Sequence, residues 1–222
     1  MTTSRYDAIA DWYIDFTRDW PLEPVAPLPP AIGGQRVVDL ACGYGTTSRY
    51  LAQAGAVVTA VDLSRSLLTR AEEIESHSPA PSEIRYLHGD ITTTEWWDGD
   101  PFDGAACNMA LMDVDDVSGA LATAIAVLAR GGWFSLSILH PCFPGGPSNG
   151  GSGLSSWPPD RGYAWEGLWN TDGIGVRGHA DVNHRMLSTY LNALLHAGFE
   201  FEEFAEPPSD VPRFLGIRCR KA

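Results

Sequence analysis

One segment of the chain, RVVDLACGYGTTSRYLAQAGAVVTAVD, constrains the fold more than any other. Residues 37–41 form a short apolar run, a glycine turn follows, residues 46–54 have a helical pattern, and residues 57–61 resume a strand pattern that ends at Asp62. Strand, glycine turn, helix and strand make the first βαβ unit of a doubly wound α/β sheet. Ligands of such sheets bind beyond the carboxyl ends of the strands, so this spacing predicts a nucleotide-type pocket.

Two carboxylates flank the glycine turn and indicate which nucleotide it binds. Asp39 precedes the turn, and Asp62 follows it at the distance of a ribose-binding acid. The pyrophosphate of a dinucleotide needs open N–H groups at a helix N-terminus, and an acid at Asp39 would repel it. S-adenosylmethionine has no phosphate and carries a sulfonium and an ammonium, which the same acid attracts. Because Ser48 also replaces the third glycine of GxGxxG, the segment favours S-adenosylmethionine.

With this motif the chain resembles the class I S-adenosylmethionine-dependent methyltransferases of the small-molecule type, over residues 37–139 in particular. The family motif is an acid, one residue and GxGxG; DLACGYG keeps Asp39, Gly43 and Gly45 and has Ala41 at the first glycine. Alanine costs little there if φ is negative, whereas a positive φ would crowd the ligand. The resemblance implies a doubly wound, Rossmann-like seven-stranded α/β sheet, mostly parallel with one antiparallel strand, and helices on both faces.

The resemblance also implies a donor site. Asp90 follows a strand over 84–87 and would hold the adenine amino group, while Ile91 would lie on the ring; an ordinary Gly-Asp turn is the alternative. Residues 108 and 109 follow a strand over 102–107 and would line the methyl-transfer gap. The implied donor-binding residues are Tyr13, Asp39, Ala41, Gly43, Gly45, Asp62, Leu63, Asp90, Ile91, Asn108 and Met109, with S-adenosyl-L-methionine as cofactor and S-adenosyl-L-homocysteine as product.

Three acids in the segment NMALMDVDD precede an apolar helix pattern. Asp113, Asp115 and Asp116 are expected to cap and charge the N-terminus of this helix, which the glycine pair at 131–132 ends. A strand over 133–139 follows. A helix over 187–195 and strands over 199–204 and 214–219 complete the predicted sheet, with the last strand antiparallel between its neighbours as in the resembled fold.

His140 is the candidate catalytic residue. It lies at the carboxyl end of the strand over 133–139, near where the donor methyl group would point in the resembled fold. An imidazole with an unperturbed pKa near 6.5 is suited to removing a proton from a hydroxyl or ammonium acceptor. A hydrogen-bonded structural histidine at the pocket rim is the alternative.

Two segments are candidate lids over the acceptor. In the N-terminal segment, residues 1–30, apolar side chains at helical spacing form one face of a helix. This helix packs on the sheet edge, brings Tyr6, Trp12 or Tyr13 to the ligands, or does both. The second segment is a Gly-, Pro- and Ser-rich insertion over about 143–183, whose aromatic residues suit a flat or hydrophobic acceptor and can bind a cation. The predicted acceptor-binding residues are Tyr6, Trp12, Phe143, Trp157, Trp165, Trp169 and His184.

Composition narrows the class of protein. The chain has 222 residues, enough for the single domain we expect over 1–222. Its net charge of −13 argues against a nucleic-acid partner, because phosphate contacts need Lys or Arg. The four cysteines are scattered without metal-ligand spacing, so we expect no metal. No long apolar span or signal peptide occurs, which predicts a cytoplasmic protein without a membrane partner; the oligomeric state stays open.

The sequence thus predicts a methyltransferase that moves a methyl group to the oxygen or nitrogen of a small aromatic or hydrophobic molecule, with specialised metabolism as the expected setting. One alternative is a protein that binds the donor for regulation or for chemistry other than methylation, because the pocket signature reports binding and not the bond broken. The other is an NAD-dependent oxidoreductase. Asp39 and Ser48 argue against it, as does the absence of a Tyr-x-x-x-Lys pair from the sequence.

Overall fold

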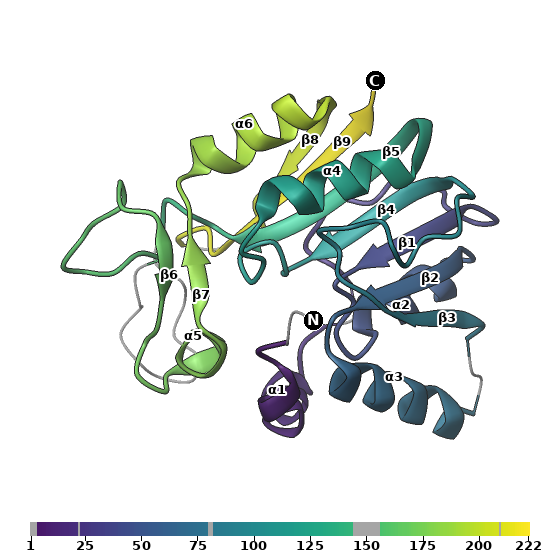
Figure 1. Ribbon diagram of the computed structural model, residues 1–222, viewed down its shortest axis with the longest axis horizontal. Coiled ribbons are helices and arrows are strands. Elements are labelled where there is room, and N and C mark those ends of the chain that lie inside the picture. The colour runs from purple at the N-terminus through teal and green to yellow at the C-terminus, as the bar shows by residue number, and fades with distance from the viewer. Residues whose placement is uncertain (1–3, 22, 80–81, 144–155, 209) are drawn as a thin grey trace.

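The computed structural model describes residues 4–21, 23–79, 82–143, 156–208 and 210–222 (Figure 1). Seven strands form one sheet in the order β3-β2-β1-β4-β5-β9-β8, and β9 runs antiparallel to β5 and β8 on either side of it. The predicted seven-stranded, mostly parallel sheet with one antiparallel strand is therefore confirmed. The strands are β1 (Arg36–Leu40), β2 (Val57–Asp62), β3 (Ile84–His88), β4 (Phe102–Asn108), β5 (Leu128–Leu139), β8 (Phe199–Ala205) and β9 (Phe214–Lys221).

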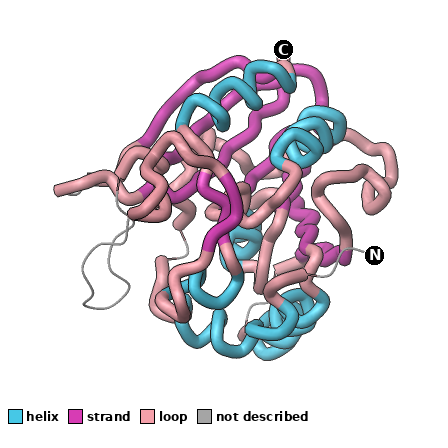
Figure 2. Tube along the Cα trace, turned by 60° about the vertical axis from the view of Figure 1, so that its left-hand side comes forward, coloured by secondary structure: helices cyan, strands magenta, loops and turns pink. Residues whose placement is uncertain are grey.

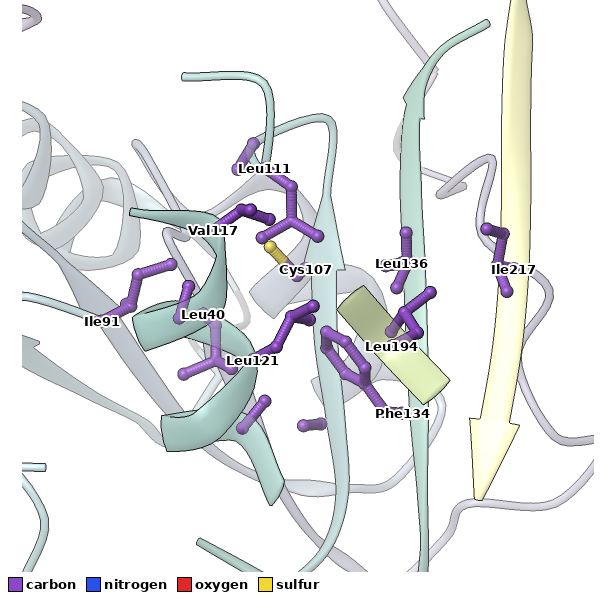
Figure 3. Packing of buried hydrophobic residues seen from close by; sticks show 14 of the residues in the cluster. Leu40, Ile91, Cys107, Leu111, Val117, Leu121, Phe134, Leu136, Leu194 and Ile217 are labelled. Atoms are coloured by element: carbon purple, nitrogen blue, oxygen red, sulfur yellow. The ribbon is translucent and has the colours of Figure 1, made fainter. Parts of the chain in front are cut away.

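Helices cover both faces of this sheet, because its inner strands carry apolar side chains on both sides. Val37 of β1 packs with Leu51 of α2, whereas Val38 belongs to the cluster that includes Leu121 of α4 and Leu194 of α6. In Figure 3, the side chains of α4 and α6 lie beside Phe134 of β5. The helices are η1 (Asp7–Ile9), α1 (Ala10–Thr17), α2 (Thr46–Gln53), α3 (Arg65–His77), α4 (Val117–Val127), α5 (Gly175–Ala180) and α6 (Leu187–Ala197).

The junction between α4 and β5 differs from the sequence prediction. Helix α4 ends at Val127, before the glycine pair at 131–132, and the chain enters β5 directly at Leu128. Leu128 pairs with Phe102 of β4, and a register shift follows before the regular pairing of Gly104 with Trp133. Strand pairing therefore extends β5 toward its N-terminus, and the glycine pair lies inside the strand, with Gly131 at a φ of 73°. Among the described residues, none of the helices has the length and apolar character that crossing a membrane requires.

The insertion predicted over 143–183 adds a small unit of its own. Strands β6 (Gly167–Trp169) and β7 (Val182–His184) pair antiparallel as a separate two-stranded sheet, with α5 between them in sequence. Figure 2 brings this unit to the front, ahead of the main sheet. Residues 144–155 of the predicted insertion lie outside the described residues.

The close contact between Gly104 and Trp133 yields a stability prediction. A Cβ at Gly104 would lie 2.0 Å from Cε2 of Trp133, and the buried indole donates a hydrogen bond to Gln35 at 2.8 Å, so the ring cannot retreat freely. We expect Gly104→Ala to lower the free energy of unfolding by about 1–3 kcal/mol through overpacking. Urea unfolding should show a lower midpoint with an unchanged slope.

Gly33→Ala is the matched control, because a Cβ there meets its nearest atom at 3.7 Å. Its effect should stay within about 0.5 kcal/mol. Equal stabilities of the two variants would contradict the packing argument.

Candidate functional site

A cavity of about 400 Å³ lies at the carboxyl ends of β1, β2 and β4. Its walls come from the glycine turn after β1, the end of β2, residues 90–92 after β3, residues 108–116 after β4, and the N-terminal segment. Of the predicted donor-binding residues, those lining the cavity are Tyr13, Asp39, Ala41, Gly43, Asp62, Leu63, Asp90, Ile91, Asn108 and Met109. The sheet topology therefore gathers residues that are up to 96 positions apart in the sequence, as the distance from Tyr13 to Met109 shows.

Gly45 is the predicted donor-binding residue that does not line this cavity. It is the N-cap of α2 at a φ of 83°, and a Cβ there would lie 2.4 Å from the hydroxyl of Tyr86. Glycine is thus required at this position by the backbone conformation and by the close approach of Tyr86. Its role is to shape the turn.

The first carboxylate, Asp39, is buried and accepts a hydrogen bond from Ser48. The Ser48 hydroxyl donates a hydrogen bond to Oδ2 of Asp39 at 2.6 Å, and both side chains are buried. Burial raises the pKa of Asp39 to about 7, although the hydrogen bond from Ser48 acts in the opposite direction. The serine that replaces the third glycine of a dinucleotide motif therefore supplies a partner for a buried acid.

The second carboxylate, Asp62, fixes the glycine turn. Its Oδ2 accepts the N–H of Gly43 and its Oδ1 accepts the N–H of Ser64, both at 2.7 Å. Burial raises the pKa of Asp62, while these two hydrogen bonds oppose the shift. Each carboxylate oxygen has a further lone pair, so Asp62 can also accept ribose hydroxyls from the cavity.

Two non-glycine residues with positive φ lie on the cavity wall. Ala41 has a φ of 57°, so the alternative with a negative φ is wrong and the turn keeps the left-handed conformation despite its side chain. Met109 has a φ of 56°, and its N–H donates to the Ser137 carbonyl at 2.9 Å. Strained backbone of this kind collects at ligand sites, where the surrounding structure holds it in place.

The end of β4 departs from the prediction for its three acids. Asp116 is the N-cap of α4, and Asp115 forms an ion pair with Arg5 at 3.0 Å. Asp113, however, does not cap the helix: it lines the cavity, and burial raises the pKa of its carboxyl to about 7. The sequence prediction did not distinguish Asp113 from Asp115 and Asp116, because all three are aspartates within four positions of the chain.

The N-terminal segment contributes residues between positions 4 and 21 to the wall of the cavity. Tyr6 and Tyr13 line it, and their rings meet edge to face at 5.0 Å. Asp7 fixes the segment by accepting the Ser64 hydroxyl at 2.7 Å. Trp12 does not line the cavity and stacks instead on His179 of α5, with ring centroids 3.8 Å apart.

His140 lies outside the lining of the cavity and is held within the protein. Its Nδ1 accepts the N–H of Cys142 at 3.2 Å, which leaves the proton on Nε2, and Nε2 donates to Glu206 at 2.9 Å. A general base must reach the acceptor. The position of His140 therefore supports the structural alternative and not the predicted catalytic role.

The aromatic residues of the insertion make their own contacts outside this lining. Phe143 packs on His140, and Trp157 lies near Tyr163 and His184. His184 hydrogen-bonds the Tyr163 carbonyl at 2.9 Å, and burial lowers its pKa. The two remaining rings each face a guanidinium, Trp165 that of Arg161 at 4.8 Å and Trp169 that of Arg177 at 4.6 Å.

Comparison with known proteins identifies relatives of this chain. A family model described as a methyltransferase domain matches residues 38–136. An uncharacterized methyltransferase of Mycobacterium bovis is 33% identical over 147 residues, which cover 66% of this chain and 68% of that protein. A ubiquinone biosynthesis O-methyltransferase of Bordetella avium is 32% identical, over 54% of this chain and 48% of that one.

The structure of an S-adenosylmethionine-dependent methyltransferase from Mesorhizobium loti is also similar. It superposes with a TM-score of 0.69 at 33% sequence identity, and the match covers 87% of this chain and 94% of that one. The likeness therefore extends over nearly all of that protein and includes sequence as well as fold.

The Asp39–Ser48 pair yields a pH-dependent prediction. Because the pKa of Asp39 is about 7 in the native protein and about 4 in an unfolded chain, the native state takes up a proton between these values. The contribution of Asp39 to stability therefore falls as the pH rises through this window. Ser48 stabilises the ionised form, so we expect Ser48→Ala to cost about 1.5–3 kcal/mol above pH 8 and less, about 0.5–1.5 kcal/mol, near pH 5.5.

Urea unfolding at the two pH values measures this difference. Thr69→Ala is the control, because the Thr69 hydroxyl donates to a carbonyl of its own helix at an exposed position. Its effect should be the same at both pH values. A Ser48→Ala effect that does not change with pH would refute the dependence of Asp39 on Ser48.

Proposed function

Because the chain belongs to the class I S-adenosylmethionine-dependent methyltransferases, we propose that it methylates an oxygen or nitrogen of a small aromatic or hydrophobic molecule. The observation that carries this proposal is the cavity at the carboxyl ends of β1, β2 and β4, where buried carboxylates surround a glycine turn. Such a site attracts a sulfonium and an ammonium and repels a diphosphate.

The residues of this cavity fit S-adenosylmethionine. Asp62 offers free lone pairs to ribose hydroxyls, and Asp39 adds negative charge below the turn. Asp90 keeps its side chain in place by accepting the N–H and hydroxyl of Thr92 at 2.9 and 2.7 Å, which supports its assignment to the adenine amino group. The buried side chain of Ile91 supports an apolar contact with the ring.

Aromatic side chains of the N-terminal segment line the cavity and support an aromatic or hydrophobic acceptor. Tyr6 and Tyr13 present aromatic surface there. A relative from Bordetella avium is named a ubiquinone biosynthesis O-methyltransferase, which supports a small-molecule acceptor. We assign residues 1–30 to an N-terminal lid and residues 143–183 to a second lid whose aromatic residues reach an acceptor when it binds, all within a single domain over 1–222.

The chemistry needs no covalent enzyme intermediate. When bound, S-adenosylmethionine supplies an electrophilic methyl group on sulfur, and S-adenosylhomocysteine is the product. The protein holds the acceptor heteroatom in line with that group and excludes water, and such positioning can supply about 7–11 kcal/mol of the barrier. A base within reach of the acceptor adds about 10²- to 10⁴-fold when the acceptor arrives protonated.

Asp62→Ala tests the donor site. The variant loses the acceptor of two backbone N–H groups and of the ribose hydroxyls, so we expect the Kd of S-adenosylhomocysteine to rise about 10- to 100-fold, the equivalent of one or two hydrogen bonds to a charged group. Isothermal titration calorimetry measures the affinity. NADH, titrated in parallel, should not bind.

Asp98→Ala provides the control, because Asp98 pairs with Arg85 at a surface site, 2.8 Å apart. It should bind S-adenosylhomocysteine as the unaltered protein does. Normal binding by Asp62→Ala, or NADH binding in place of S-adenosylhomocysteine, would overturn the assignment.

A further inference from the structure

Asp113 is a carboxylate of the cavity wall that the donor site does not use. It follows β4 in the loop over 109–116, and the Tyr6 hydroxyl faces its carboxyl group. Its Oδ1 is buried and accepts no hydrogen bond from any residue that the structure describes. Buried acceptors are nearly always paired in folded proteins, so an unpaired one on a cavity wall points to a ligand that donates.

The charge of the cavity indicates which kind of hydrogen-bond-donating group the acceptor molecule carries. Among the described residues that line it, the only basic side chain is Arg5, whose guanidinium is already bound to the Asp115 carboxylate and the Asp113 carbonyl. The acids that line the cavity are Asp39, Asp62, Asp90, Asp113, Asp115 and Asp116. S-adenosylmethionine brings two positive centres and one carboxylate, so the field stays negative and favours a cationic over an anionic acceptor.

Aromatic rings also line the cavity. Tyr6, Tyr13, Trp20 and Tyr44 line the cavity, and Tyr13 meets Tyr6 and Tyr44 edge to face at 5.0 and 6.0 Å. Ring faces attract organic cations through their quadrupole. A carboxylate with a free oxygen beside such rings is an environment suited to an ammonium group.

We propose that the acceptor is a protonated amine, whose ammonium group Asp113 binds and whose proton Asp113 accepts. This inference rests on the proposed function and deepens it, because it selects nitrogen over oxygen and names a proton acceptor on the cavity wall.

The proton and electron balance is complete. The ammonium nitrogen has no lone pair until the carboxylate of Asp113 takes one proton from it. The freed lone pair then forms the N–C bond while the C–S bond breaks and its electron pair stays on sulfur, so the positive charge passes from sulfur to the methylated nitrogen. Asp113 returns its proton to water afterwards. Burial raises the pKa of Asp113 to about 7, which makes it a stronger base than an exposed carboxylate.

Several charged groups surround Asp113 and set its titration. Arg5 and Arg177 lower its pKa, and Asp62 raises it. The titratable and charged groups that face it are Arg5, Tyr6, Tyr13, Asp62, Cys107, Arg177 and Tyr190. A pH profile that vanishes on substitution of Asp113 alone therefore reports on this carboxyl.

Binding of matched small molecules tests the proposal. The probes are 2-phenylethylamine, benzylamine and cyclohexylamine, each with the alcohol or carboxylate of the same skeleton, titrated into the protein saturated with S-adenosylhomocysteine. We expect the amines to bind about 10- to 100-fold more tightly than the alcohols, as a hydrogen-bonded charge pair requires, and the carboxylates not to bind. The amine affinity should fall below about pH 7 as Asp113 becomes protonated.

Three variants complete the design. Asp113→Asn should abolish both the preference for amines and its pH dependence, while its affinity for S-adenosylhomocysteine stays within about threefold; Asp113→Glu should restore part of the preference. Asp98→Asn, at the surface pair with Arg85, should behave as the unaltered protein does.

The outcomes are separable. Failure of S-adenosylhomocysteine to bind the unaltered protein would contradict the proposed function itself. If S-adenosylhomocysteine binds, three results would overturn the present inference alone. These are tighter binding of the alcohols or carboxylates than of the amines, no binding of any amine, and an amine preference that survives in Asp113→Asn.

Discussion

The carboxylate of Asp62 joins the ends of two neighbouring strands, and the ligand site depends on this link. It stands at the end of β2 and accepts N–H groups from the turn after β1 and from the residue that caps α3. Both acceptor bonds are charge-assisted, which makes them stronger than ordinary backbone bonds. The turn can therefore keep three positive-φ residues, Ala41, Gly43 and Gly45, in one short stretch. One side chain thus fixes the floor of the cavity and faces its contents.

The negative charge of the cavity is stabilised by different means at each acid. Asp39 has the hydroxyl of Ser48, Asp62 has two backbone N–H groups, and Asp115 has a guanidinium. Asp113 is the exception among these four, because one of its oxygens has no partner among the described residues. Burial without full compensation raises pKa values. A bound cation would relieve this cost, so ligand binding and the charge state of the cavity are coupled.

The sheet, and the meeting of the proposed donor-binding residues at one cavity, could be predicted from sequence, because both depend on local signals. Strand patterns, a glycine turn and acids at strand ends occur within short windows, and the parallel topology then brings Asp39, Asp62 and Asp90 to one edge. Whether the side chains of Asp113 and His140 face the cavity depends on their orientation in the folded chain. The spacing of residues in the sequence does not determine that orientation. A hydrogen bond to Glu206, 66 positions away in the sequence, holds the side chain of His140 outside the cavity lining. The aromatic insertion was recognisable by composition, but composition does not fix which way its rings face.

The N-terminal segment holds the two sides of the molecule together above the cavity. On one side Asp7 and Asp11 bind Ser64 and Arg70 at α3, and on the other the Trp12 ring lies on His179 of the insertion. In the proposed lid these contacts would have to part when ligands exchange. Lid opening would then contribute to the turnover rate alongside the chemical step.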